Sequence, residues 1–182
     1  MTTLFEQTLK RRILLLDGGM GTYLQQQNLT EADFGGPDLD GCNEHLVLTR
    51  PDVILDVHRA YLKAGSDIIS TNTFGSTPLV LAEYNLADQA ELISKRAAEL
   101  ARHAVNEVAT VAWPRFVAGA MGPTTKSLSV TGGATFEDLL ESYYVQASGL
   151  IQGGVDVLLL ETSQDLLNVK AASLGIMRAF DE

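Results

Sequence analysis

Four short apolar runs, spread along the whole chain, constrain most strongly what this sequence can fold into. Each run is continuous rather than alternating, which is typical of strands buried on both faces, as in a parallel sheet. We therefore predict a strand at each of these places. Their approximate bounds are 12–17, 67–72, 116–121 and 155–161.

Helical patterns separate and follow these runs. The clearest pattern begins near Pro51, after the capping residue Thr49, and ends at Gly65, with apolar residues at helical spacing between them. Further apolar stripes of helical period predict helices over about 86–108, 135–150 and 164–180. Regular alternation of strands and helices implies an α/β fold with a parallel sheet and right-handed crossovers.

The connection after the first run is longer than the others and rich in glycine. We predict a short helix over about 22–27, followed by a loop that extends to residue 48. Long loops at the ends of buried strands are often functional, so this loop is expected to border an active site.

A short repeat supports the strand–helix alternation. Residues 64–72 and 153–161 share a glycine, any residue, an aspartate, an apolar strand and then a polar residue. Each copy begins where a predicted helix ends. Closed barrels and open doubly wound sheets both contain such units, so the repeat does not distinguish between them.

Composition excludes several classes of protein. A net charge of −10 disfavours non-specific binding to nucleic acid or to an anionic membrane surface. Cys42 is the single cysteine, so no intrachain disulfide can form, which suits a reducing compartment. No apolar run approaches the roughly 18 residues that span a bilayer, and the amino terminus lacks a secretory signal pattern. We therefore expect a cytoplasmic protein that binds neither nucleic acid nor membrane.

The carboxyl ends of the predicted strands carry the residues best suited to chemistry, because parallel α/β folds gather their ligand sites there. Asp17 and Glu161 provide two carboxylates, and Asn72 provides a carboxamide. The Gly18–Gly19 turn can present backbone N–H groups to an anion. Two acceptors for an ammonium group and donors for a carboxylate together predict a site for a zwitterionic amino acid.

Each of these residues also has a purely structural interpretation. Asp17 could form an ordinary Asp-Gly turn, Glu161 could favour a helix N-terminus, and Asn72 could close a strand end. The glycine turn lacks the spacing of dinucleotide- and phosphate-binding loops, so nucleotide binding is disfavoured.

The histidines and the cysteine are weaker candidates for chemistry. We expect His58 and His103 to be solvated or capping residues on helices, and Cys42 to be incidental. The sequence has no Cys/His cluster, so we predict no metal ligands in this chain.

Several segments together resemble a known family. The segments that carry the similarity are 13–22, 29–35, 46–65, 67–74 and 153–162. They resemble the amino-terminal homocysteine-binding domain of cobalamin-dependent methionine synthases, within the wider homocysteine S-methyltransferase family. The similarity extends from about Arg12 to Phe180, and the combination of Asp-Gly-Gly-Met-Gly-Thr with a later Thr-Asn-Thr-Phe is fairly specific.

The resemblance implies a (β/α)₈ barrel with homocysteine at its carboxyl-end mouth. By matching position, Asp17 and Glu161 are expected to hold the substrate ammonium, Gly18 and Gly19 to meet its carboxylate, and Asn72 to line the pocket. The family also implies a zinc ion, held by three cysteine thiolates, that favours the homocysteine thiolate. That thiolate accepts the methyl group of methylcobalamin, which methyltetrahydrofolate later restores.

The chain departs from this family in one large respect. Its residues 1–182 correspond to a partial domain, the first half, (β/α)₄, of a barrel that typically needs about 250 residues. The family's zinc cysteines lie on strands six and eight, so none is expected here, and no catalytic residue is assigned. We expect the isolated chain to be inactive and to pair with the remaining half of the barrel and with cobalamin- and folate-binding modules.

Three alternative functions remain open at this stage. The chain could be a non-catalytic half-barrel that pairs with itself or with a complementary chain. It could belong to a homocysteine methyltransferase that uses another methyl donor. A phosphate-binding barrel enzyme of another family is a third alternative, which rests on fold analogy alone.

Overall fold

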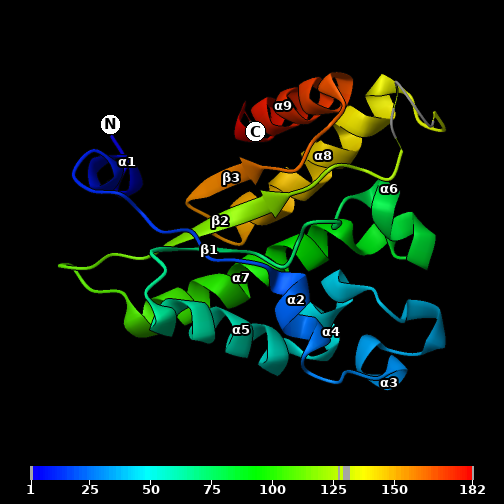
Figure 1. Ribbon diagram of the computed structural model, residues 1–182. Coiled ribbons are helices and arrows are strands. Elements are labelled where there is room, and N and C mark those ends of the chain that lie inside the picture. Colours follow the sequence, from blue (N-terminus) through cyan, green and yellow to red (C-terminus); the bar gives the residue numbers. More distant parts are fainter. Residues whose placement is uncertain (1, 127, 129–131, 182) are drawn as a thin grey trace.

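A parallel sheet with helices between its strands forms the framework of the molecule (Figure 1). The computed structural model describes residues 2–126, 128 and 132–181. Strands β1 (Ile68–Ser70), β2 (Phe116–Met121) and β3 (Val157–Leu160) lie in the order β1-β2-β3, and all pairs are parallel. Ile68 pairs with Phe116 and Ala118 with Val157. The predicted α/β class and parallel sheet are confirmed.

The first predicted strand, over 12–17, is largely wrong in extent. This segment runs parallel beside β1 but makes one isolated bridge, between Leu16 and Ile68. Two hydrogen bonds form this bridge, because the Leu15 carbonyl accepts from Ile68 N at 3.0 Å and Asp17 N donates to the Ile68 carbonyl at 3.0 Å. Ile13 is 85% exposed, so a continuous apolar run did not mean burial on both faces in this edge segment.

Four long helices accompany the strands. They are α5 (Pro51–Ala64), α7 (Ala90–Val108), α8 (Phe136–Gln152) and α9 (Leu166–Asp181). Consecutive members pack side by side, α5 on α7, α7 on α8 and α8 on α9. Gly65 ends α5 in the left-handed region at φ 110°, and Thr135 begins α8 with a capping box to Asp138. All four helices were predicted, with end shifts of a few residues.

Shorter elements fill the connections. The first group contains α1 (Leu4–Leu9), α2 (Met20–Gln25), α3 (Glu31–Phe34), η1 (Pro37–Leu39), η2 (Asn43–His45) and α4 (Leu46–Thr49). The second contains α6 (Pro78–Leu81), η3 (Ala82–Tyr84) and η4 (Ala87–Gln89). The predicted short helix over 22–27 is α2, which begins earlier. The predicted loop after it is a chain of short helices, packed on the core through buried residues such as Phe34 and Leu46.

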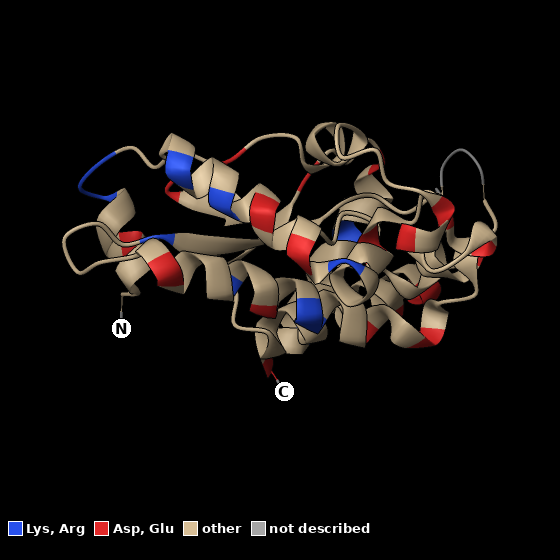
Figure 2. Cartoon of the chain, turned by 90° about the horizontal axis from the view of Figure 1, so that it is seen from below, with Lys and Arg blue, Asp and Glu red and all other residues tan. Residues whose placement is uncertain are grey.

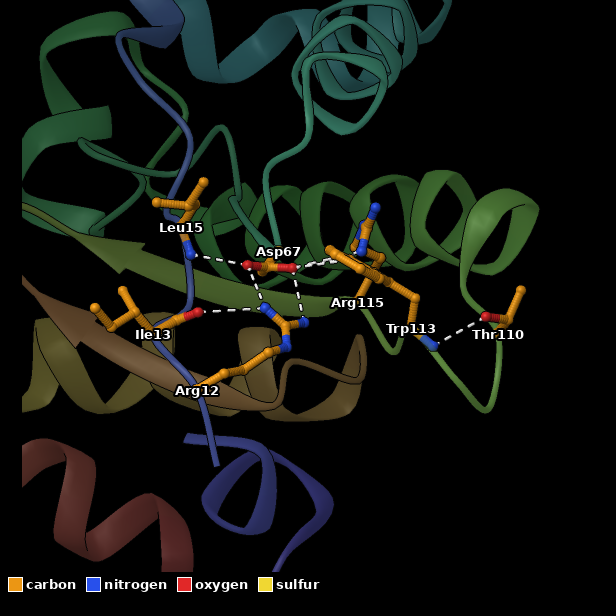
Figure 3. A network of polar contacts seen from close by, with 7 residues as sticks. All are labelled: Arg12, Ile13, Leu15, Asp67, Thr110, Trp113 and Arg115. Carbon is orange, nitrogen blue, oxygen red and sulfur yellow. Dashed lines mark hydrogen bonds and ion pairs between the residues drawn. The ribbon is translucent and has the colours of Figure 1, made fainter. Parts of the chain in front are cut away.

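The repeated aspartate has a structural role at the amino end of the sheet. The Asp67 carboxylate accepts hydrogen bonds from Leu15 N at 3.0 Å, from both Arg12 Nη atoms at 2.7 and 2.8 Å, and from Trp113 Nε1 at 3.0 Å (Figure 3). Asp156 repeats the arrangement directly before β3, where it accepts from Val117 N of β2 at 2.7 Å. Each aspartate therefore ties its strand to the preceding one.

His58 lies in the core, contrary to the prediction of a solvated or capping histidine. It is fully buried in α5, and among the described residues neither ring nitrogen has a hydrogen-bond partner. The reason is its spacing, because Ile54, His58 and Leu62 fall on the same helical face, which packs inward. His103 matches the prediction, since its exposed ring lies 3.2 Å from Glu107 on the same helix.

Two glycines allow close packing between the long helices. A Cβ added at Gly149 of α8 would lie 2.4 Å from the Glu91 carbonyl oxygen of α7. A Cβ added at Gly175 of α9 would lie 2.6 Å from the Leu140 carbonyl oxygen of α8. Backbone cannot yield as a flexible side chain can, so both contacts require glycine.

Replacing Gly149 tests this packing directly. Alanine is the better helix former, so Gly149→Ala would stabilise a loosely packed helix by up to about 1 kcal/mol. We expect the opposite, a loss of about 1–3 kcal/mol in the free energy of unfolding, because α7 and α8 must separate. Urea denaturation measures the change, with Ser148→Ala on the same helix as the control. A stabilised Gly149→Ala protein would contradict the packing described here.

The surface of the described part is charged and mixed. Lys and Arg residues lie scattered among Asp and Glu residues over the helices (Figure 2), an arrangement typical of a solvated surface. Among the described residues, no helix is long and apolar enough to cross a membrane.

Candidate amino-acid-binding site

A cavity of about 390 Å³ opens at the carboxyl ends of the strands. All five residues that the sequence singled out as site residues, Asp17, Gly18, Gly19, Asn72 and Glu161, line it. The remaining lining residues are Leu16, Met20, Gly21, Ser70, Thr71, Thr73, Phe74, Ala120 and Leu159. The tertiary fold thus brings together side chains that lie up to 144 positions apart in the sequence, between Asp17 and Glu161.

Asp17 is held by one residue of the neighbouring strand. Ser70 N donates to Asp17 Oδ2 at 2.7 Å, and Ser70 Oγ donates to Oδ1 at 2.8 Å. Burial raises the pKa of Asp17 to about 6, the two Ser70 hydrogen bonds oppose this effect, and the charge of Glu161 adds to it. Asp17 is therefore a fixed carboxylate whose negative charge is destabilised by burial and by Glu161.

Glu161 follows β3 directly. Its backbone N–H donates to the Met121 carbonyl at 3.1 Å, which continues the pairing of β2 and β3 by one residue. The next residue, Thr162, has a left-handed backbone at φ 55°, which is unusual for a β-branched side chain and turns the chain away from the sheet. The charge of Glu161 acts on Asp17 across the cavity, so the two carboxylates repel each other.

Asn72 joins the cavity to the long connection after α2. It is buried, and its Nδ2 donates to the Asn43 carbonyl of η2 at 2.7 Å. Glu44 of η2 makes a second hydrogen bond between the same two segments, because its Oε1 accepts from Gly75 N at 2.8 Å. Asn72 therefore has a structural role as well as a place in the cavity wall.

The glycine turn lies against a tyrosine that the sequence did not single out. Gly19 is the N-cap of α2, and its carbonyl accepts a hydrogen bond from Tyr61 Oη at 3.3 Å. A Cβ added at Gly18 would lie 3.1 Å from Tyr61 Oη. Gly18 thus permits the turn to pass close beneath Tyr61.

Sequence reasoning also missed Ser70. The sequence predicts a strand over 67–72, whereas β1 ends at Ser70. A polar residue inside an otherwise apolar run was the signal that could have found it, because such a residue marks the strand end or faces a ligand.

The described residues do not fit a zinc ion. Among them, no group of three or more His, Cys, Asp or Glu side chains could hold a metal. Cys42 is fully buried in the core around α4 and α5, where burial raises the pKa of its thiol to about 11. Cys42 is therefore a protonated core residue, as the prediction of an incidental cysteine implied.

A family model matches nearly the whole chain. It describes homocysteine S-methyltransferases and matches residues 14–180. The chain belongs to this family. A methionine synthase from Mycobacterium leprae (strain TN) is 44% identical to it over 176 residues. That match covers 97% of the chain and 14% of the methionine synthase.

Solved structures of a second relative share the fold of this chain. The homocysteine methyltransferase MmuM from Escherichia coli, in its metallated form, matches with a TM-score of 0.78 at 24% identity, over 97% of the chain and 63% of MmuM. Its oxidized form matches with a TM-score of 0.75 at 25% identity, over 95% of the chain and 61% of MmuM. The chain thus spans less than two thirds of the length of each of these relatives.

Proposed function

We propose that this chain supplies the amino-acid-binding part of the homocysteine site in a methyltransferase that converts homocysteine to methionine. One observation carries the proposal: Asp17, Glu161 and the Gly18–Gly19 turn line one cavity at the carboxyl ends of the strands. Carboxylates and backbone N–H groups at one mouth are the complementary partners of an amino acid's ammonium and carboxylate.

The two carboxylates bind the ammonium group of homocysteine. A cation between Asp17 and Glu161 relieves their repulsion and lowers the pKa of Asp17, which burial and the charge of Glu161 raise to about 6. The N–H groups of the glycine turn meet the substrate carboxylate, and Asn72 lines the pocket beside the substrate. These contacts to the ammonium and carboxylate groups orient the homocysteine side chain and leave its sulfur free to react.

The rest of the machinery is proposed to lie outside residues 1–182. Family membership supports the use of zinc and methylcobalamin, but the described residues do not fit zinc, so we assign it no ligand here. We propose that residues 1–182 form the first (β/α)₄ half of a barrel, inactive alone, which works with the second half and with cobalamin- and folate-binding modules in the cytoplasm. Apolar side chains are exposed on segment 12–17 and on α9, and this supports the proposal that the second half of the barrel covers them. They include Ile13, Leu16, Met177 and Phe180.

Two single substitutions test the site. Asp17→Asn and Glu161→Gln keep the size of each side chain but remove its charge. We expect each to weaken binding of L-homocysteine to the full-length protein about ten- to hundredfold, because a hydrogen bond to a charged group contributes about 1.5–3 kcal/mol.

Isothermal titration calorimetry measures the affinity. Glu137→Gln, on the exposed first turn of α8, is the matched control and should bind homocysteine like the wild type. Unchanged affinity in both site variants would refute the assignment of Asp17 and Glu161.

A further inference from the structure

Ser70 occupies a position in the cavity that its hydrogen bonds make chemically specific. It is the last residue of β1 and lines the cavity beside Asp17. Its backbone N–H and its hydroxyl both donate to Asp17, one to each carboxylate oxygen, at 2.7 and 2.8 Å. Both donors of Ser70 are therefore already in use.

The hydroxyl oxygen of Ser70 is left as an acceptor. A serine hydroxyl has one O–H donor and two lone pairs, and the donor here is directed at Asp17 Oδ1. Donation to a carboxylate polarises the O–H bond and makes the oxygen a better acceptor. Any ligand group that meets Ser70 Oγ must then be a donor.

An ammonium group has three N–H donors, so three acceptors around it satisfy it fully. Asp17 and Glu161 supply two of them under the proposed function, on which this inference rests. We propose that Ser70 Oγ is the third acceptor, so that Asp17, Glu161 and Ser70 together bind the primary ammonium group of the amino acid. Ser70 thereby makes the site selective for ligands with a free amino group.

The other hydroxyl groups of the cavity wall have different partners. Thr71 Oγ1 accepts from Ala120 N at 3.0 Å and contacts Thr73 Oγ1 at 2.6 Å. Thr73 Oγ1 donates to the Ala120 carbonyl at 2.7 Å. Both threonines are buried and join β1 to β2, so their hydroxyls serve the sheet, whereas the Ser70 hydroxyl serves Asp17.

The experiment compares two ligands that differ in the amino group. L-homocysteine and 4-mercaptobutanoate share a thiol and a carboxylate, but 4-mercaptobutanoate has no ammonium. In the full-length protein, we expect Ser70→Ala to weaken homocysteine binding about tenfold and to leave binding of 4-mercaptobutanoate within twofold. Ser70→Thr, which keeps the hydroxyl, should restore the affinity, and Ser173→Ala on α9 is the control.

A double substitution separates direct contact from an effect through Asp17. In an Asp17→Asn background, loss of Ser70 Oγ should still weaken homocysteine binding several-fold if Ser70 contacts the ligand. No further loss in that background, or an equal loss for both ligands in Ser70→Ala, would overturn the proposal. Ser70→Cys gives the same comparison if the alanine protein does not fold.

The outcomes also distinguish this inference from the proposed function. If Asp17→Asn weakens homocysteine binding and Ser70→Ala does not, the third acceptor is wrong and the proposed function stands. If the wild-type protein does not bind homocysteine, the proposed function fails, and this inference fails with it.

Discussion

Replacing Asp67 by alanine is expected to lower the free energy of unfolding by about 3–5 kcal/mol, the typical cost of removing one partner from a buried ion pair. The Asp67 side chain is 3% exposed and the paired Arg115 side chain is 13% exposed. Without the carboxylate, Arg115 keeps a charge that is largely shielded from water. Leu15 N and Trp113 Nε1 also lose their acceptor.

The Asp67 carboxylate is stabilised as an anion by these neighbours. The hydrogen bond from Arg12 is the main cause that holds the pKa of Asp67 below its usual range, and the charges of Arg12 and Arg115 add to it. Asp67→Asn should also destabilise the protein, since an amide cannot accept from all these donors (Figure 3).

Asp156→Ala is the matched control for Asp67→Ala. It removes the equivalent aspartate of the repeat, but the ion pair of Asp156 with Arg102 leaves 27% of each side chain exposed. Water can then replace part of what is lost, and we expect a smaller effect, about 1 kcal/mol. Urea denaturation of the two variants measures the difference. Equal losses would contradict the claim that burial of the Asp67 network decides its contribution.

Acid is expected to destabilise the protein through His58, by about 3 kcal/mol between pH 6.5 and pH 4. Burial lowers the pKa of His58 from 6.5 to about 4. Below pH 6.5 the unfolded chain binds a proton that the folded protein does not, so the unfolded state gains stability as the pH falls. The pKa difference corresponds to about 3 kcal/mol.

His58→Leu should remove this pH dependence. Leucine fits a buried apolar face, and among the described residues His58 leaves no hydrogen-bond partner behind. We expect the leucine protein to match or exceed the wild type at pH 7 and to exceed it by about 3 kcal/mol more at pH 4.

The comparison of the two proteins isolates His58 from Asp17. The pKa of Asp17 is raised to about 6, so its protonation stabilises the folded state as the pH falls, with the opposite sign. Both proteins contain Asp17, and its effect cancels in the difference. Urea denaturation at pH 7, 5.5 and 4 measures that difference, and a constant value across this range would refute the role given to His58.

The two ends of the sheet therefore have different functions. At the amino end, Asp67 and Asp156 are paired with arginines and bind neighbouring strands together. At the carboxyl end, Asp17 and Glu161 line one cavity, and the charge of Glu161 acts on Asp17. Among the described residues, neither of these two carboxylates is paired with an arginine. The first arrangement stabilises the fold. The second keeps two carboxylates that repel each other, and under the proposed function a cationic ligand relieves that repulsion.

The sequence predicted most of the framework because local pattern governs it. Residues 116–121 were predicted as a strand and form β2 without a shift, since this run is buried on every position. The helices followed from apolar spacing and from the caps at Thr135 and Gly65. The five candidate residues line one cavity because parallel strands place their carboxyl ends at one edge.

Tertiary structure decided the rest. Three features depend on neighbours that are distant in the sequence. They are the exposure of Ile13, the burial of His58 and the two hydrogen bonds from Ser70 to Asp17. An apolar run predicts burial only if another element covers it, and in the described residues the edge segment has β1 on one side. The sequence by itself determined the places of three strands and of the four long helices, and five residues of the cavity wall. The environment of each side chain, and with it the pKa of Asp17 and His58, was decided by packing, because desolvation and charge act through space and not along the chain.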